Sequence, residues 1–183
     1  TGLIYIPAQD IPFAYGADEN FEYTPGLWNV GVNLLYASFA EQPPEAQAEL
    51  MKMITGQIIA WDTVQRKVVW RVRHPLPWYG GMLATACNLI FQGNSVGEFA
   101  AYTADSGEKL WSMGAQTGIV ASPVTYEVDG EQYVTVLAGW GGSLALSGGD
   151  LAAATGVRNI SRVLTFKLGS SGTLPPVETP ALV

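Results

Sequence analysis

The sequence predicts an all-β protein, on the basis of its composition, its turn residues and a long internal repeat. Hydrophobic residues make up 48% of the 183 residues and charged residues only 14%, a core-rich composition that argues against disorder. The 21 glycines and 11 prolines stand largely between short apolar runs. Turn residues in that pattern favour many short strands over long helices.

An internal repeat refines this fold class. The segment from Ala60 to Trp70 matches the segment from Ala101 to Trp111, so that the leading alanines and the closing tryptophans are each 41 residues apart. A period of about 40–45 residues with a repeated tryptophan is typical of β-propeller blades, which have four strands each. We therefore expect Trp70 and Trp111 to occupy equivalent places on successive blades, as packing residues.

One complete blade is predicted between about residues 80 and 112. Its strands are short apolar or alternating runs at residues 82–86, 89–92, 97–102 and 109–111. Asp105-Ser106-Gly107 forms a tight turn before the last strand, with Gly107 available for positive φ. Arg66 stands at the position of this glycine in the preceding repeat.

The units on either side of this blade are incomplete. The expected strands are residues 3–6, 57–61 and 68–70 before it, and 121–126, 132–137 and 162–168 after it. Asp129-Gly130 is a strong hairpin turn within the later unit. The chain then holds about two and a half to three blades, which is too few to close a ring. We expect a partial β-propeller that belongs to a larger ring, because an open stack leaves edges and faces unpaired.

Two insertions and a tail interrupt the pattern. Residues 10–52 separate strands that should be neighbours, and Pro43–Met51 predicts a short helix with a proline in its first turn. A second insertion, at about residues 146–160, is rich in Gly, Ala and Ser. Long loops on a propeller shape one face. We expect residues 1–168 to form the blades and residues 169–183, rich in Pro, Gly and Ser, to form a tail or linker.

The charge pattern argues against several classes of partner. The formal net charge is −7, which disfavours binding to nucleic acid or anionic lipid. The sequence has no apolar run long enough for a membrane-spanning helix. The segment that starts at Thr1 is predicted to be a strand and not a signal peptide, so an export signal would lie upstream of it. The single cysteine, Cys87, cannot form an internal disulfide.

Several segments together resemble one enzyme family. Ala101–Trp111 follows the alanine–aspartate–glycine–tryptophan pattern of quinoprotein dehydrogenase blades, and Trp78–Ala86 is similar to a tryptophan-glycine-glycine stretch that opens a strand there. Tyr126–Val134 followed by Ala138–Gly142 resembles the penultimate stretch of these enzymes, and Pro25–Asn29 resembles a segment after their active-site half. The chain thus resembles the C-terminal part of the eight-bladed propeller of pyrroloquinoline quinone (PQQ)-dependent alcohol dehydrogenases, of the quinoprotein or quinohaemoprotein type.

The resemblance implies a function and a set of site residues. Enzymes of this family oxidise alcohols to aldehydes with PQQ and a calcium ion, and an aspartate acts as the base. By position, Trp78, Tyr79, Gly142 and Ser143 are implied to bind the cofactor, although Ser143 departs from the alanine or tryptophan usual at its place. No catalytic residue and no metal ligand is predicted in this chain, because the aspartate, the calcium ligands and the family's vicinal cysteine pair do not appear in it.

The resemblance also implies partners and a compartment. The partners are the alcohol substrate, the remainder of the propeller and a cytochrome c that accepts electrons, and the compartment is the periplasm. The linker-like tail fits a haem c domain downstream, although this chain has no Cys-x-x-Cys-His motif. We expect residues 1–183 alone to be inactive, because catalysis needs a positioned base and calcium needs several oxygen ligands.

Several residues also have a purely structural interpretation. The Gly80-Gly81 pair either lines the cofactor or only permits close packing of blades. Tyr79 and Trp78 are bulky aromatics that also suit a core or a rim. His74, the only histidine, is expected in a loop with no metal-binding or catalytic role, because no potential ligand has suitable spacing nearby. Cys87 is expected to be a small buried residue at a strand end.

A non-catalytic function is the alternative. Outer-membrane assembly scaffolds are propellers of similar repeats that bind proteins without PQQ. The segments 78–86 and 138–142 resemble the dehydrogenases more closely. A vicinal cysteine pair and a catalytic aspartate upstream would favour the enzyme, whereas a lipoprotein signal would favour the scaffold.

Overall fold

The computed structural model describes residues 1–12, 16–27, 29–33, 42–77, 79–141 and 156–177. The elements in these ranges are β1 (Leu3–Asp10), α1 (Pro44–Met53), β2 (Thr55–Asp62), β3 (Lys67–His74), β4 (Met82–Ala84), β5 (Leu89–Gly93), β6 (Glu98–Thr103), β7 (Lys109–Gly114), β8 (Val124–Val128), β9 (Glu131–Ala138) and β10 (Arg162–Lys167). The helix predicted at Pro43–Met51 is confirmed as α1, with a proline at its start.

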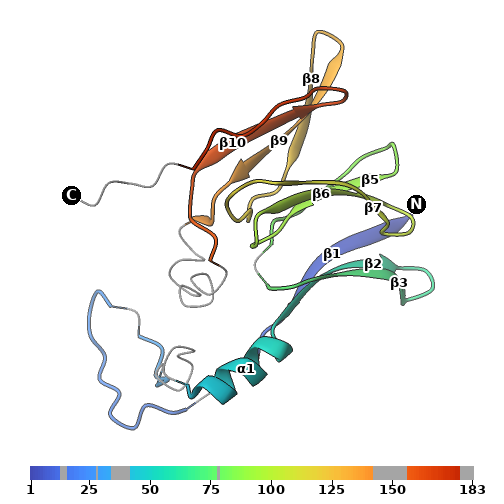
Figure 1. Cartoon of the computed structure of the whole chain (residues 1–183). Helices are drawn as coiled ribbons and strands as arrows, with labels where there is room; N and C mark the ends of the chain where they lie inside the picture. Colours follow the sequence, from blue (N-terminus) through green and yellow to red (C-terminus); the bar gives the residue numbers. More distant parts are fainter. Residues whose placement is uncertain (13–15, 28, 34–41, 78, 142–155, 178–183) are drawn as a thin grey trace.

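The strands form three antiparallel sheets that lie next to one another (Figure 1). The first blade has the strand order β1-β2-β3, the middle blade β4-β5-β6-β7 and the third blade β10-β9-β8. β1 pairs with β2 along its whole length, across the long insertion between them. The predicted all-β fold and partial propeller are confirmed, with one four-stranded blade between two three-stranded ones.

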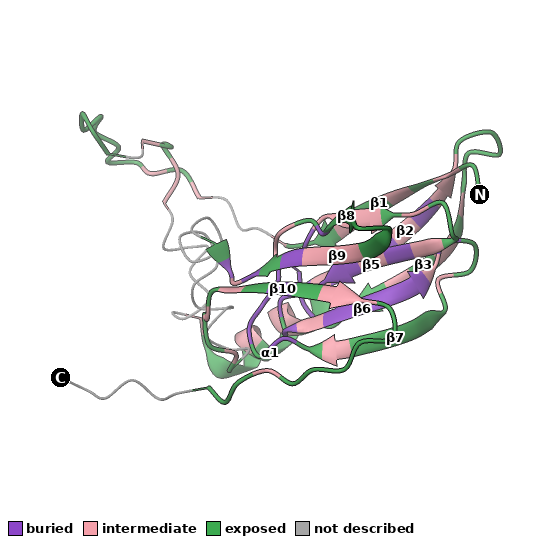
Figure 2. Ribbon diagram, turned by 90° about the horizontal axis from the view of Figure 1, so that it is seen from above, coloured by how far each residue is buried: buried purple, intermediate pink, exposed green. Residues whose placement is uncertain are grey.

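The middle blade is covered on both faces. Ala100 and Tyr102 of β6 pack with Ile58 of the first blade. Phe99 of the same strand packs with Val136 of the third blade. Figure 2 shows the buried positions of β6 between the more exposed outer strands. A strand buried on both faces has an almost unbroken apolar sequence, as residues 99–102 do.

The two tryptophan repeats have the same register. Ala60 of β2 lies opposite Trp70 of β3, and Ala101 of β6 lies opposite Trp111 of β7. In both sheets the register shifts directly after the alanine. The equivalent placement predicted from the 41-residue spacing is therefore confirmed.

A turn of the middle blade receives Trp70 from the first blade. Trp70 Nε1 donates a hydrogen bond to the carbonyl oxygen of Ala104 at 3.2 Å, and the Tyr5 hydroxyl donates to the same oxygen at 2.8 Å. The indole lies so close to Gly107 that a Cβ there would be 2.6 Å from the ring. Gly107 also has a φ of 73°. The absence of a side chain therefore serves both the turn and the contact between blades.

Arg66 takes the equivalent place in the first blade. Its φ is 54°, so a non-glycine residue holds the left-handed conformation that Gly107 holds in the next repeat. The carboxylate of Asp62 supports this turn by accepting hydrogen bonds from the backbone N–H groups of Val64 and Gln65, each at 2.8 Å.

Trp111 contacts the third blade in a different way. Its ring lies edge-on to Phe166 of β10, with the centroids 5.4 Å apart, and edge-on to Phe99 of its own blade at 6.1 Å. The side chain is 42% exposed. Trp70 and Trp111 thus occupy equivalent strand positions but contact the following blade differently. Trp70 packs on a glycine turn, whereas Trp111 packs in an aromatic cluster.

The two ends of the sheets differ in their connections. Tight turns at residues 63–66, 85–88, 104–107 and 129–130 join strands at one end. The opposite end carries α1 and the connections 75–81 and 115–123, and β9 also finishes there (Figure 1). We call this opposite end the long-connection end. Longer connections are where binding residues concentrate on rigid scaffolds, so this end is the one to search for a site.

Two strands are shorter than predicted, and one of them changes the place of Cys87. β8 begins at Val124 and not at residue 121, because Pro123 has no N–H to donate to the sheet. β4 ends at Ala84 and not at residue 86. Cys87 consequently lies in the turn before β5 and is exposed, so the prediction of a buried cysteine was wrong.

His74 also differs from its predicted environment. The residue is the last one of β3 and is only 6% exposed, whereas the neighbouring Arg73 and Pro75 had indicated a loop. β3 continues to this position because its ladder with β2 runs as far as the pair of Gly56 and His74.

The exposed outer face of the third blade carries several large apolar side chains beside a threonine pair and a Lys167–Glu131 ion pair. Its large side chains are between 42% and 69% exposed, and they are Val124, Tyr126, Val128, Leu137 and Val163. These residues share one face of the sheet, since Val124 pairs with Thr135 and Leu137 with Val163. An apolar sheet face of this kind is typical of an interaction surface, and it fits the expectation of a larger ring.

The first part of the predicted tail contributes to the core. Leu174 packs against the hydrophobic cluster between the middle and third blades. Arg162 Nη2 also donates to the carbonyl oxygen of Pro175 at 3.5 Å. Among the described residues, no helix is long and apolar enough to cross a membrane.

The Trp70–Gly107 contact can be tested with two glycines of similar backbone conformation. Gly107 and Gly130 have φ values of 73° and 78°, so alanine at either position introduces about 1–2 kcal/mol of backbone strain. Nothing lies within 4 Å of the added Cβ at Gly130, whereas Trp70 must move at Gly107. We expect Gly107→Ala to lose about 1–3 kcal/mol more unfolding free energy than Gly130→Ala, measured by urea unfolding. Equal losses would contradict the importance of this contact.

Candidate cofactor-binding site

Of the residues predicted to bind a cofactor, the structure describes Tyr79. Trp78, Gly142 and Ser143 lie outside the described residues. Tyr79 lies in the connection from β3 to β4, at the long-connection end, and its side chain is partly exposed.

Tyr79 is held against the first blade by three contacts. Its hydroxyl oxygen accepts a hydrogen bond from the backbone N–H of Gln57 at 3.1 Å. Its ring covers Gly56 so closely that a Cβ there would overlap the ring atoms. The His74 ring lies 5.0 Å away, between ring centroids, at an interplanar angle of 46°. An aromatic ring at the start of the middle blade is thereby fixed on the neighbouring blade.

A buried polar pair lies behind this ring. His74 Nε2 and Gln92 Oε1 are 2.8 Å apart, and Gln92 Nε2 donates to the carbonyl oxygen of Gly80 at 2.8 Å. Gln92 is only 2% exposed. The pair links the last residue of β3 to the backbone that follows Tyr79.

Gly80 and Gly81 contact the connection that leads from the middle blade to the third blade. A Cβ at Gly80 would overlap the carbonyl oxygen of Ala121, and one at Gly81 would overlap the Ser122 hydroxyl. Gly80 N–H also donates to the carbonyl oxygen of Gly93 at 3.0 Å. Close packing explains both glycines, because any side chain there would push away the connection that contains Ala121 and Ser122.

Trp140 lies beyond the end of β9 in the same region. Its indole ring packs against Val120 and Val157 and covers Gly118. Its backbone N–H donates to Asn159 Oδ1 at 3.0 Å. The indole Nε1 is buried and has no hydrogen-bond partner among the described residues. The nitrogen lies against Gly118, where a Cβ would overlap it.

Burial also sets the protonation of the titratable groups here. Burial lowers the pKa of His74, while the hydrogen bond to Gln92 opposes that shift. Burial raises the pKa of Tyr79, and the hydrogen bond from the Gln57 backbone opposes it. At neutral pH the site therefore presents a neutral imidazole and a neutral phenol. An aromatic wall with fixed donors is suited to binding and orienting a flat polar ligand.

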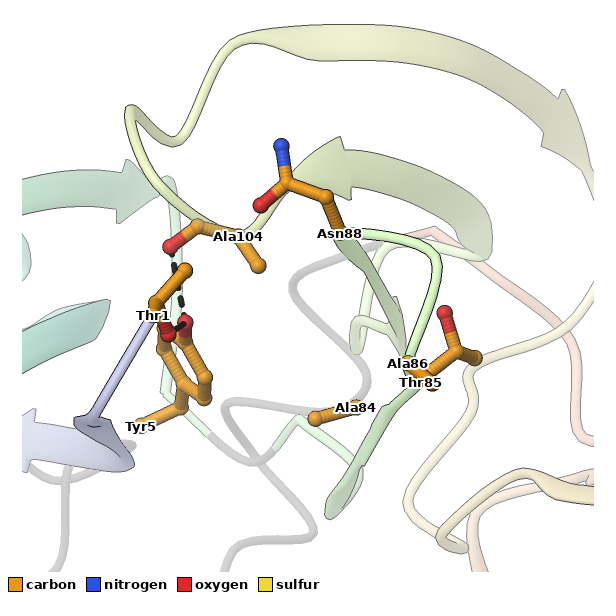
Figure 3. A pocket seen from close by; sticks show the side chains of 7 residues that line it. All are labelled: Thr1, Tyr5, Ala84, Thr85, Ala86, Asn88 and Ala104. Atoms are coloured by element: carbon orange, nitrogen blue, oxygen red, sulfur yellow. Dashed lines mark hydrogen bonds between the residues drawn. The ribbon is translucent and has the colours of Figure 1, made fainter.

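A small pocket lies elsewhere, at the tight-turn end (Figure 3). It is lined by Thr1, Tyr5, Ala84, Thr85, Ala86, Asn88 and Ala104. These residues surround the Tyr5–Ala104 hydrogen bond and have no carboxylate, imidazole or ammonium side chain. Within the described ranges, no group of three His, Cys, Asp or Glu side chains is placed to hold a metal ion.

Comparisons with known proteins identify the family. Residues 45–134 match the PQQ family described as glucose/ethanol/alcohol dehydrogenase, β-propeller domain. The quinohemoprotein alcohol dehydrogenase ADH IIB of Pseudomonas putida is 43% identical over 184 residues, covering 100% of this chain and 25% of that protein. The solved structure of ADHIIG from Pseudomonas putida HK5 matches 99% of this chain and 27% of that chain, with a TM-score of 0.83 and 37% identity.

The chain belongs to the PQQ-dependent alcohol dehydrogenase family. A second solved structure, the quinohemoprotein alcohol dehydrogenase of Comamonas testosteroni, has a TM-score of 0.73 and 36% identity, over 96% of this chain and 25% of that one. The chain spans about a quarter of the length of the relatives it matches. It corresponds to a portion of their β-propeller, and the matched family is one of enzymes and not of assembly scaffolds.

The sequence of this member of the PQQ-dependent family did not predict three residues of the candidate site. The sequence predicts His74 to be a loop residue without a role, and it predicts only a strand position for Gln92. Trp140 had been noted only as part of a resemblance. Strand alternation could have indicated that Gln92 points inward, since Ile90 and Gln92 are both buried on β5. A buried polar residue in an apolar strand is the informative signal.

The buried imidazole makes the stability of the fold sensitive to acid. Burial keeps the folded-state pKa of His74 below the ordinary histidine value of 6.5. The unfolded state therefore takes up the proton first, so this contribution is present above pH 6.5 and is lost as the pH falls toward the folded-state pKa. Between about pH 7.5 and pH 5, the urea midpoint should fall less steeply for His74→Gln than for the unsubstituted protein. Identical slopes would contradict a buried neutral His74.

Proposed function

We propose that this chain forms the C-terminal blades of a PQQ-dependent dehydrogenase that oxidises alcohols to aldehydes, and that it supplies part of the quinone pocket. The observation that carries the proposal is the Tyr79 ring, which three contacts hold at the long-connection end. The relatives by which the family is known include quinohemoprotein alcohol dehydrogenases.

The described residues fit the binding of PQQ, a flat quinone with several carboxylates. Tyr79 offers a partly exposed aromatic face. Trp140 packs beside this region, with its indole nitrogen buried against Gly118. The two regions adjoin, because Gly80 approaches Val120 and Trp140 packs on Val120. We propose Trp78, Gly142 and Ser143 as further contacts, on the strength of the resemblance.

The residues of this chain bind and orient, and they do not carry out the proton transfer. When bound, PQQ supplies the oxidising quinone that accepts two electrons from the alcohol. Tyr79, a neutral phenol, provides a wall that keeps a planar ring in place. Packing of Gly80 and Gly81 against the connection at Ala121 and Ser122 supports the backbone that follows that wall. The base and the calcium ligands are proposed to come from other parts of the enzyme.

The proposal also covers the electron acceptor and the cellular location of the enzyme. Some relatives are named quinohemoproteins, and one is named 1-butanol dehydrogenase (cytochrome c). We propose a cytochrome c as the electron acceptor, with haem c in a downstream domain that the tail would connect. A periplasmic location follows from the resemblance to the family.

The wall can be tested with Tyr79 and Tyr5, two tyrosines that lie where the first and middle blades meet. In the whole dehydrogenase, Tyr79→Ala should weaken PQQ binding about five- to tenfold, since an aromatic contact contributes on the order of 1 kcal/mol beyond burial. Tyr5→Ala removes a tyrosine from the same boundary between the first and middle blades, but at the tight-turn end, where its hydroxyl donates to the carbonyl oxygen of Ala104. That control should lose stability and keep its PQQ affinity.

The measurement is the equilibrium dissociation constant of PQQ for the apoenzyme, with alcohol turnover as a second readout. Unchanged affinity in Tyr79→Ala would show that the ring is ordinary blade packing and would overturn the proposed wall. Equal losses in both variants would show a general effect of stability and would overturn it as well.

A further inference from the structure

We propose that Gln92 and His74 are positioning residues that orient the backbone at Tyr79 and Gly80 for the cofactor, a role that rests on the function proposed above. Neither side chain needs to contact the cofactor. Their hydrogen bonds connect β3 of the first blade and β5 of the middle blade to the connection between these blades.

The direction of each hydrogen bond follows from the chemistry of the groups. The oxygen of Gly80 can only accept, so the group of Gln92 that faces it must be the amide nitrogen. The amide oxygen of Gln92 then faces His74 Nε2 and can only accept, so Nε2 must carry the hydrogen. The chain of donors therefore runs from His74 through Gln92 to Gly80, with one arrangement available.

Burial makes this arrangement strongly specified. Gln92 is 2% exposed and His74 is 6% exposed, so neither has water as an alternative partner. A buried amide that loses its partners incurs the full desolvation cost, which disfavours other rotamers. An apolar side chain would fill the same space without the desolvation cost of a buried polar group. The polar pair is explained by the direction that it imposes on the backbone.

The backbone at Gly80 and Gly81 is the most flexible part of the site and therefore depends most on the hydrogen bond from Gln92. Gly80 and Gly81 have no side chains, and glycine has the widest choice of backbone conformations. The two peptides on either side of Gly80 are both held, the Tyr79–Gly80 peptide by the Gly80 N–H bond to Gly93 and the Gly80–Gly81 peptide by the Gln92 amide. Holding both peptides fixes the backbone angles of Gly80, and through them the direction in which the chain leaves Tyr79.

The pair also explains the approach of the His74 ring to Tyr79. Gln92 holds the imidazole by Nε2, and the ring centroids of His74 and Tyr79 are 5.0 Å apart. Gln92 thus acts on the proposed wall twice, once through the Gly80 peptide and once through the imidazole behind the ring.

The test is the PQQ affinity of the whole dehydrogenase, measured by equilibrium binding to the apoenzyme. Gln92→Met keeps the length of the side chain and removes both hydrogen bonds, and we expect PQQ to bind on the order of tenfold more weakly. His74→Phe keeps a ring beside Tyr79 and removes the donor, with an expected loss of about three- to fivefold. His74→Gln restores an N–H donor close to the place of Nε2 and should recover affinity to within about twofold.

A matched control separates positioning from general stability. Val136→Ala creates a cavity in the cluster between the middle and third blades, away from Tyr79, and it should lower the melting temperature without changing PQQ affinity. If Gln92→Met does not fold, Gln92→Leu takes its place. Leucine also has neither a donor nor an acceptor, so the same loss of affinity is expected.

The outcomes distinguish this role from the proposed function. If Tyr79→Ala weakens PQQ binding and Gln92→Met behaves like Val136→Ala, the positioning role is overturned and the wall stands. If His74→Gln binds PQQ no better than His74→Phe, the donor is irrelevant and the positioning role is also overturned. If Tyr79→Ala leaves the affinity unchanged, the proposed wall itself fails, whatever Gln92 does.

Discussion

The stacking of one sheet on the next is the constraint on which the rest of this structure depends. A four-stranded sheet of these residues cannot bury two apolar faces alone, and the middle blade does so only because a neighbour covers each face. Trp70 fixes the first seam by donating to Ala104 and covering Gly107. Trp111 fixes the second seam at Phe166. The apolar face that the third blade leaves exposed follows the same rule and is explained by a further neighbour in the ring.

The candidate site is a product of this stacking. Gly56 and His74 come from the first blade, Tyr79 and Gln92 from the connection to the middle blade and from the middle blade itself. Gly56 and His74 pair within one sheet, but Tyr79 and Gln92 reach them only where two sheets come together. Glycines allow the meeting, because a Cβ at Gly56 would overlap the ring of Tyr79. The blades supply rigidity at one end of the stack, and the longer connections supply the groups that a ligand would contact.

The repeat made most of the fold predictable, whereas contacts between blades were not. The 41-residue spacing was sufficient for the register of Trp70 and Trp111, because equal spacing places residues on equivalent strands. Local pattern could not place Cys87, since the end of β4 depends on where its partner strand turns. It also could not pair His74 with Gln92, which are 18 residues apart and on different blades. Such pairings become visible only when the order of the sheets in space is known.

A structure of the intact protein with PQQ bound is the most direct test of the central claim, that these three sheets are consecutive blades of one cofactor-binding propeller. The account predicts the Tyr79 ring in van der Waals contact with the quinone, at the long-connection end. It also predicts another sheet covering the exposed face around Tyr126, Leu137 and Val163. PQQ bound away from Tyr79, or a third blade whose outer face stays open to solvent, would contradict the account.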